Sequence, residues 1–148
     1  NQKIMLVLFA ALLMGACKKK DATNKVPSIK LNNSDSVTSG SSKDTVKISF
    51  EFEDGDADIV TDGKTINIFV TNTRDTNKFN YPFPYIDDAF KDPTVGFKGT
   101  CIVRIPAAFI LIDDPNVQKD STQFMVKIKD AANHFSNEII TPKVFLLK

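Results

Sequence analysis

The sequence predicts an all-β protein, an antiparallel β-sandwich of about seven strands. Two observations carry this prediction. Residues 45–53 alternate apolar and polar side chains without interruption, which is the pattern of a strand with one face in a core. Further runs of this kind are separated by clusters of Asn, Ser, Asp and Gly, and no convincing amphipathic helix lies between them. Strands punctuated in this way are typical of two packed antiparallel sheets.

The predicted strands cover most of residues 28–148. They are residues 28–32, 45–53, 65–71, 99–105, 123–129 and 138–147. Residues 109–112 are expected to continue the fourth of these after a break at Pro106, and residues 87–91 to form one helical turn. Pro142 has no amide hydrogen, so the last strand should lie at an edge or contain a bulge there. The tryptophan and cysteine pair of antibody domains are absent, so the prediction of an immunoglobulin-like sandwich concerns architecture alone.

The amino-terminal residues have the pattern of a secretory signal. The apolar run 4–14 is shorter than the roughly 20 residues that a membrane-spanning helix needs, and it suits the hydrophobic core of a signal peptide. Two small residues then precede Cys17, and three lysines follow it. Residues 13–17 resemble the lipobox of bacterial lipoproteins, with Met14 where that family usually has Leu.

In the lipoproteins that this motif resembles, the cysteine carries diacylglycerol, the signal is removed before it, and the new amine is acylated by a fatty acid such as palmitate. The resemblance implies lipidation of Cys17. It implies a place in the bacterial cell envelope, at the outer membrane in preference to the inner, with the folded part facing the periplasm or the cell surface. The membrane is then a partner through the lipid anchor.

Composition and patterning divide the chain into three parts. Residues 1–16 are the predicted signal peptide, 17–26 the lipidated cysteine and a polar tether, and 27–148 the sandwich. Removing the signal takes 16 residues from 148 and leaves 132, enough for one domain with its own core. The mature side chains balance at 18 basic and 18 acidic, since Lys3 leaves with the signal. Bulk charge therefore does not indicate a nucleic-acid partner.

The cysteine and histidine content argues against catalysis. With Cys17 lipidated, Cys101 has no partner for an internal disulfide. Cys101 lies in an apolar stretch, so we expect a small core residue. A catalytic thiol would need a basic partner, and the chain has only His134. We therefore expect no enzyme.

An acidic loop follows the strand at residues 45–53. Asp54, Asp56 and Asp58 occupy every second position, and Gly55 permits a tight backbone path between the first two. Carboxylates with this spacing can converge on one hard cation, and calcium takes 6–8 oxygen ligands. The alternative is a solvated turn without metal, because Asp and Gly are also favoured turn formers.

A second polar segment is expected to meet this loop. Residues 129–136 join the last two predicted strands, and in an immunoglobulin-like topology that connection lies at the same end as the acidic loop. The two segments resemble the Asp-Gly-Asp loops and Asp-x-x-Asn turns of extracellular cadherin-like and related bacterial immunoglobulin-like modules. The resemblance implies calcium as the one expected cofactor. The implied ligands are Asp54, Asp56, Asp58, Asp130 and Asn133.

The aromatic segment 79–90 contains five rings and two prolines. Its Tyr81 and Tyr85, with neighbouring carboxylates, can line a site for sugar or peptide, or the rings can cover an open sheet edge. Together these features predict a lipid-anchored envelope protein with a non-catalytic interaction or structural domain, whose protein or glycan ligand the sequence does not identify. The alternative function is that of a glycan-binding surface lipoprotein.

Overall fold

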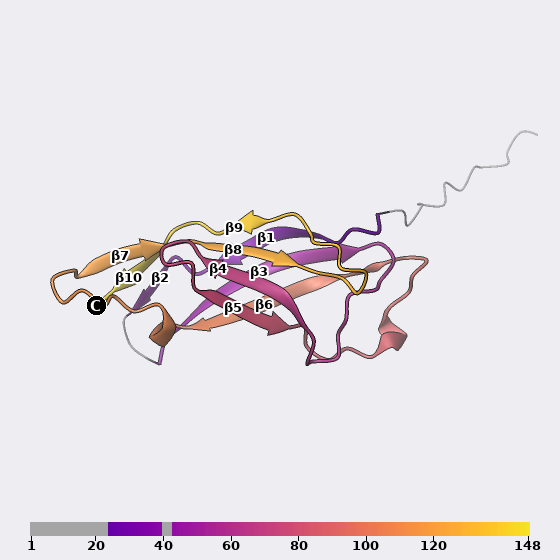
Figure 1. Ribbon diagram of the computed structural model, residues 1–148, viewed down its shortest axis with the longest axis horizontal. Helices are drawn as coiled ribbons and strands as arrows, with labels where there is room; N and C mark the ends of the chain where they lie inside the picture. The colour runs from indigo at the N-terminus through magenta and orange to yellow at the C-terminus, as the bar shows by residue number, and fades with distance from the viewer. Residues whose placement is uncertain (1–23, 40–42) are drawn as a thin grey trace, which may run out of the picture.

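The computed structural model describes residues 24–39 and 43–148, so the predicted signal peptide and Cys17 lie outside the described residues. Three sheets form the fold (Figure 1). The first orders its strands as β1 (Ser28–Ser34), β3 (Thr45–Asp54) and β6 (Phe97–Pro106). The second is β5 (Lys78–Pro82), β4 (Ile66–Asn72), β8 (Phe124–Ile128) and β9 (Ile139–Ile140). The third is β2 (Val37–Ser39), β10 (Val144–Leu147) and β7 (Lys119–Thr122). The predicted all-β sandwich is confirmed.

The ten strands correspond to seven when the two parts of each interrupted strand are counted as one strand. β1 continues into β2, β7 into β8, and β9 into β10 after short breaks. Pro142 lies in the last break, as its missing amide hydrogen requires. The pairings are antiparallel except that of β2 with β10. The sheet orders β1-β3-β6 and β5-β4-β8-β9 give the two faces of the sandwich.

The core lies between these two faces. The apolar side chains of β3 point inward at every second position, from Val46 to Phe52, and are at most 6% exposed. Val70 of β4 and Val126 of β8 pair across the opposite sheet and are fully buried. The period-2 pattern in the sequence therefore places one face of each strand in a common core.

The structure differs from the sequence-based prediction at residues 109–112 and at three short strands. Residues 109–112 do not continue β6, because the chain turns after Pro106 into η2 (Ala107–Phe109), and Ile110 is buried directly after that turn. The short strands β2, β5 and β7 were not predicted. β5 comes from the aromatic segment and forms one edge of its sheet. The predicted helical turn at 87–91 is present as η1 (Asp88–Phe90).

Side chains close both edges between the two layers. On one side, the Asn137 amide accepts from the backbone N–H of Ile29 (2.9 Å) and donates to its carbonyl (2.8 Å). The Asn137 side chain thereby acts as a neighbouring strand would for β1. On the other side, the Tyr81 hydroxyl of β5 donates to the carbonyl of Arg104 in β6 (3.0 Å).

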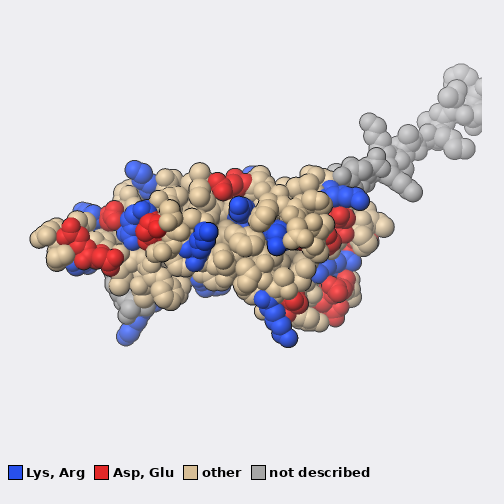
Figure 2. Space-filling view, viewed as in Figure 1, with Lys and Arg blue, Asp and Glu red and all other residues tan. Residues whose placement is uncertain are grey.

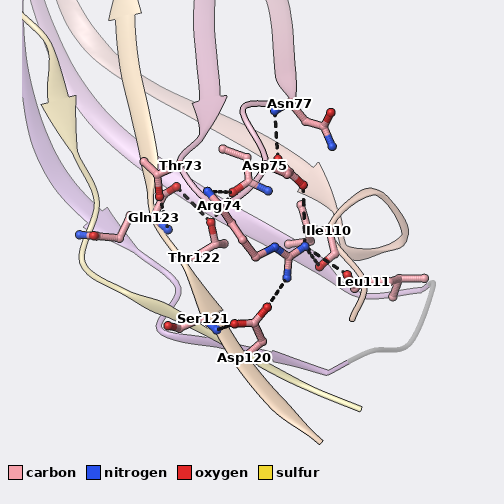
Figure 3. A network of polar contacts seen from close by, with 11 residues as sticks. Thr73, Arg74, Asp75, Asn77, Ile110, Leu111, Asp120, Ser121, Thr122 and Gln123 are labelled. Atoms are coloured by element: carbon pink, nitrogen blue, oxygen red, sulfur yellow. Dashed lines mark hydrogen bonds and ion pairs between the residues drawn. The ribbon is translucent and has the colours of Figure 1, made fainter. Parts of the chain in front are cut away.

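Arg74 organises the loops at the end of β4 (Figure 3). Its guanidinium pairs with Asp120 of β7 at 2.8 Å and donates to the carbonyls of Ile110 and Leu111 at 3.1 Å. Behind it, the buried Asn72 side chain accepts from the Arg74 backbone N–H. One side chain thus holds three segments that are far apart in the sequence.

The face shown in Figure 2 carries basic and acidic side chains interspersed, in keeping with the near balance of charge in the whole chain. Within the described residues, no helix has the length and apolar character that crossing a membrane requires.

Candidate metal centre

The acidic loop begins at the last residue of β3, and neighbouring backbone segments enclose it. The N–H of Gly55 donates to the carbonyl of Asn24 (3.1 Å), and a Cβ at Gly55 would lie well inside contact distance of that oxygen. From the other side Gly96, at φ +86°, approaches so closely that a Cβ there would lie 2.8 Å from the Asp54 carbonyl oxygen. Glycine is therefore required at both positions.

Asp54, Asp56 and Asp58 converge within this enclosed loop. One carboxylate oxygen of each lies within 4.8 Å of the other two. The Oδ1 atoms of all three residues are buried and have no hydrogen-bond partner. Asp54 is 0% exposed, and its other oxygen accepts from the backbone N–H of Ile59 (3.1 Å). Buried carboxylate oxygens without donors, in three residues this close together, are unfavourable unless a cation lies among them.

The electrostatics of the cluster agree with this reading. Burial, together with the charges of Asp56 and Asp58, raises the pKa of Asp54 to about 6, although a backbone hydrogen bond from Ile59 lowers it. Burial also raises the pKa of Asp58, as do the charges of Asp130 and then Asp56, while a backbone hydrogen bond from Ala132 lowers it. Without a cation, the ionised carboxylates therefore repel one another in a site poorly reached by water.

The connection after β8 meets the acidic loop, since Ala132 and Asp130 both act on Asp58. Both carboxylate oxygens of Asp130 contact His134 in this conformation. Its Oδ1 accepts from the His134 backbone N–H (2.7 Å), and its Oδ2 lies 2.8 Å from His134 Nδ1. The buried Asp130 carboxylate thus shapes the turn that carries Ala132 to Asp58.

Asn133 has a different place in this turn. It has a φ of +70°, a conformation that Asn tolerates better than most residues. Its side chain is exposed, and its Oδ1 accepts from Lys129 Nζ (3.1 Å). Of the five ligands implied by sequence, the structure brings together Asp54, Asp56 and Asp58, and gives Asp130 and Asn133 protein partners.

The geometry of the three aspartates fits calcium. Calcium–oxygen bonds are about 2.3–2.6 Å, so two ligands of one ion lie up to about 5 Å apart. The separations of up to 4.8 Å fall within that limit. Three carboxylates supply part of the 6–8 oxygens, and backbone carbonyls and water are the usual remainder.

The other groups considered from sequence lie elsewhere. Tyr81 is half-buried, which raises its pKa, and lines a hollow of about 410 Å³ with Cys101 between β5 and β6. Tyr85 is 73% exposed and lines a separate hollow of about 500 Å³ beside Asp58 and Lys91. The two tyrosines therefore do not share one of these hollows.

The Cys101 thiol is buried, and the His134 ring contacts a buried carboxylate. Burial raises the pKa of the Cys101 thiol to about 11, so it is protonated at neutral pH. His134 Nδ1 is held by Asp130. The sequence reading missed this pair, although an Asp four residues before the single His was a visible signal.

Comparison with known proteins finds no matching family model, no matching curated protein sequence and no matching solved structure.

Proposed function

We propose that this chain is a lipid-anchored protein of the bacterial cell envelope, attached through Cys17, whose immunoglobulin-like sandwich is a non-catalytic interaction or structural domain. Calcium binds at one end of the sandwich and stabilises it. The envelope location and the anchor rest on the resemblance of residues 13–17 to a lipobox. The protonated, buried thiol of Cys101 supports a non-catalytic role.

One observation supports calcium above the alternative of a solvated turn. The unpartnered Oδ1 atoms of Asp54, Asp56 and Asp58 are buried, whereas the carboxylates of a solvated turn face water or cap backbone N–H groups. Asp62 and Asp92 are examples of the latter kind. The Thr94 hydroxyl and backbone N–H lower the pKa of Asp92, and the Thr65 backbone N–H and hydroxyl lower that of Asp62. The Oδ1 atoms of the three-aspartate cluster lack such donors.

Thermal unfolding of the purified chain tests the calcium proposal. At calcium one hundred times the dissociation constant, stabilisation should be about 2.7 kcal/mol relative to chelator. Asp56→Asn should remove most of this response, and Asp113→Asn, which changes an exposed carboxylate outside the cluster, should retain it. Identical unfolding curves in calcium and in chelator would refute the proposal, leaving the fold unaffected.

The anchor has a separate test. Mass spectrometry of the native protein should find an acylated Cys17 as its first residue. An unprocessed amino terminus with a free thiol at that position would refute the envelope assignment.

Glycan binding remains the alternative function. The structure favours it less, because the Tyr81 hydroxyl already donates to Arg104 and the two tyrosines line separate hollows. A pull-down on cell-wall polysaccharide, compared with a Tyr85→Ser variant, distinguishes the two proposals. Retention that depends on Tyr85 would favour the alternative.

A further inference from the structure

The loop between β5 and β6 exposes three large apolar side chains. Tyr85 is 73% exposed, and Phe90 and Val95 are each 77% exposed. These are the highest values among the large apolar side chains of the described residues, where the next is Phe109 at 62%. We call residues 83–96 the apolar loop.

This loop lies at the end of the sandwich where the described chain begins (Figure 1). Gly96 lies at one end of the apolar loop, where an added Cβ would be 3.2 Å from the Cα of Gly55, and the Gly55 N–H donates to the carbonyl of Asn24. Lys91 Nζ donates to the carbonyl of Ile59 (3.0 Å), which ties the middle of the apolar loop to the acidic loop. The apolar loop, the three-aspartate cluster and the start of the domain are therefore neighbours.

The short distance along the chain from Cys17 to Asn24 limits how far this end of the sandwich can lie from a lipid on Cys17. Six residues, 18–23, lie between Cys17 and Asn24, so seven Cα–Cα steps join the two. Fully extended, they reach about 25 Å at most, at about 3.3–3.6 Å per residue. A lipid on Cys17 therefore holds the end carrying the apolar loop close to the bilayer, while β7 and β10 lie at the far end (Figure 1).

We propose that the apolar loop inserts Tyr85, Phe90 and Val95 into the interface of the bilayer to which the lipid anchors the chain. The proposal rests on the proposed function, since it takes the lipid at Cys17 as given. Aromatic side chains are enriched at membrane interfaces, where an apolar ring enters the acyl boundary and polar groups remain at headgroup level.

The polar groups of the loop suit that depth. Asp87 and Asp92 accept from backbone N–H groups of their own turns, at 2.9 Å and 2.8 Å. Asp88 pairs with Lys91 at 2.9 Å. Because the loop carries more carboxylates than cations, the expected surface is one of zwitterionic rather than anionic lipids. Insertion gives the domain a fixed orientation that a lipid anchor alone does not provide.

A single tryptophan reports the insertion, because the natural chain contains none. The lipidated full chain with Phe90→Trp is reconstituted into phosphatidylcholine and phosphatidylethanolamine vesicles, with and without lipids brominated on the acyl chains. Phe145→Trp is the matched control, since Phe145 is 50% exposed on β10 at the far end. We expect blue-shifted emission and quenching by bromine at position 90, and neither at position 145.

Three outcomes would overturn the proposal. If the protein floats with the vesicles but the tryptophan at 90 is quenched no more than that at 145, the apolar loop does not insert, and the anchor stands. If the wild-type protein fails to associate with vesicles, the proposed anchor fails and the insertion with it. If a Cys17→Ser form of Phe90→Trp shows the blue shift without vesicles and more strongly at higher protein concentration, the loop binds a second copy instead.

Discussion

Replacing Asp54 with Asn should stabilise the protein in chelator and abolish its response to calcium. The side chain is 0% exposed, and its folded-state pKa of about 6 exceeds the ordinary value of 3.8 by about two units. At about 1.4 kcal/mol per unit, keeping this carboxylate ionised costs about 3 kcal/mol at pH 7.5. The Asn amide carries no charge and can donate to the unpartnered oxygens of Asp56 and Asp58.

Part of that gain is lost. The carboxylate oxygen that accepts from Ile59 becomes a neutral amide oxygen, which weakens the bond by about 1 kcal/mol. The net stabilisation without metal should be about 2 kcal/mol. For a domain of this size that raises the melting temperature by about 8 °C.

Differential scanning calorimetry in chelator and in calcium measures both effects. In chelator Asp54→Asn should melt above the wild type, and calcium should raise only the wild type. Asp113→Asn controls for the loss of one negative charge outside the cluster. A variant that melts below the wild type in chelator, or that still responds to calcium, would refute the reasoning from the buried carboxylates.

The remaining predictions concern pH, the loop network, the thiol and a glycine. In chelator the folded state binds more protons than the unfolded state between pH 3.8 and about 6, because the pKa of Asp54 is raised. The stability difference between wild type and Asp54→Asn should therefore shrink as pH falls from 7 to 4. A constant difference in urea titrations would contradict this. Arg74→Ala should cost about 1–3 kcal/mol in the same titrations, because it leaves Asp120 and two carbonyls without their donor, and Arg74→Lys should restore part of that loss. Cys101 should resist maleimide at pH 7.5 until urea unfolds the chain, and rapid labelling of the native protein in mass spectrometry would contradict its buried, protonated state. Gly96→Ala should destabilise the fold by about 1–3 kcal/mol, since φ is +86° and the added Cβ would meet the Asp54 carbonyl; unchanged unfolding would show that the loops relax.

Much of the fold could be predicted because the signal was local. β3 alternates apolar and polar residues from Thr45 to Glu53, and its apolar set is buried in the structure. The short strands β2 and β7 carry no such signal, since their pairing with β10 rather than their own residues makes them strands. Residues 109–112 show the reverse error, because an apolar run does not by itself distinguish a strand from a buried turn.

The sequence by itself determined that the chain forms an antiparallel sandwich and that an acidic loop follows its second predicted strand, since both depend on the spacing of neighbouring residues. Only the tertiary structure decided which acidic groups face one another. In it, the Oδ1 atoms of Asp54, Asp56 and Asp58 have no donors, and the carboxylate of Asp130 contacts His134. The apolar loop lies beside the start of the domain. These arrangements depend on contacts between segments far apart in the chain, and short-range patterns in a sequence do not contain that information.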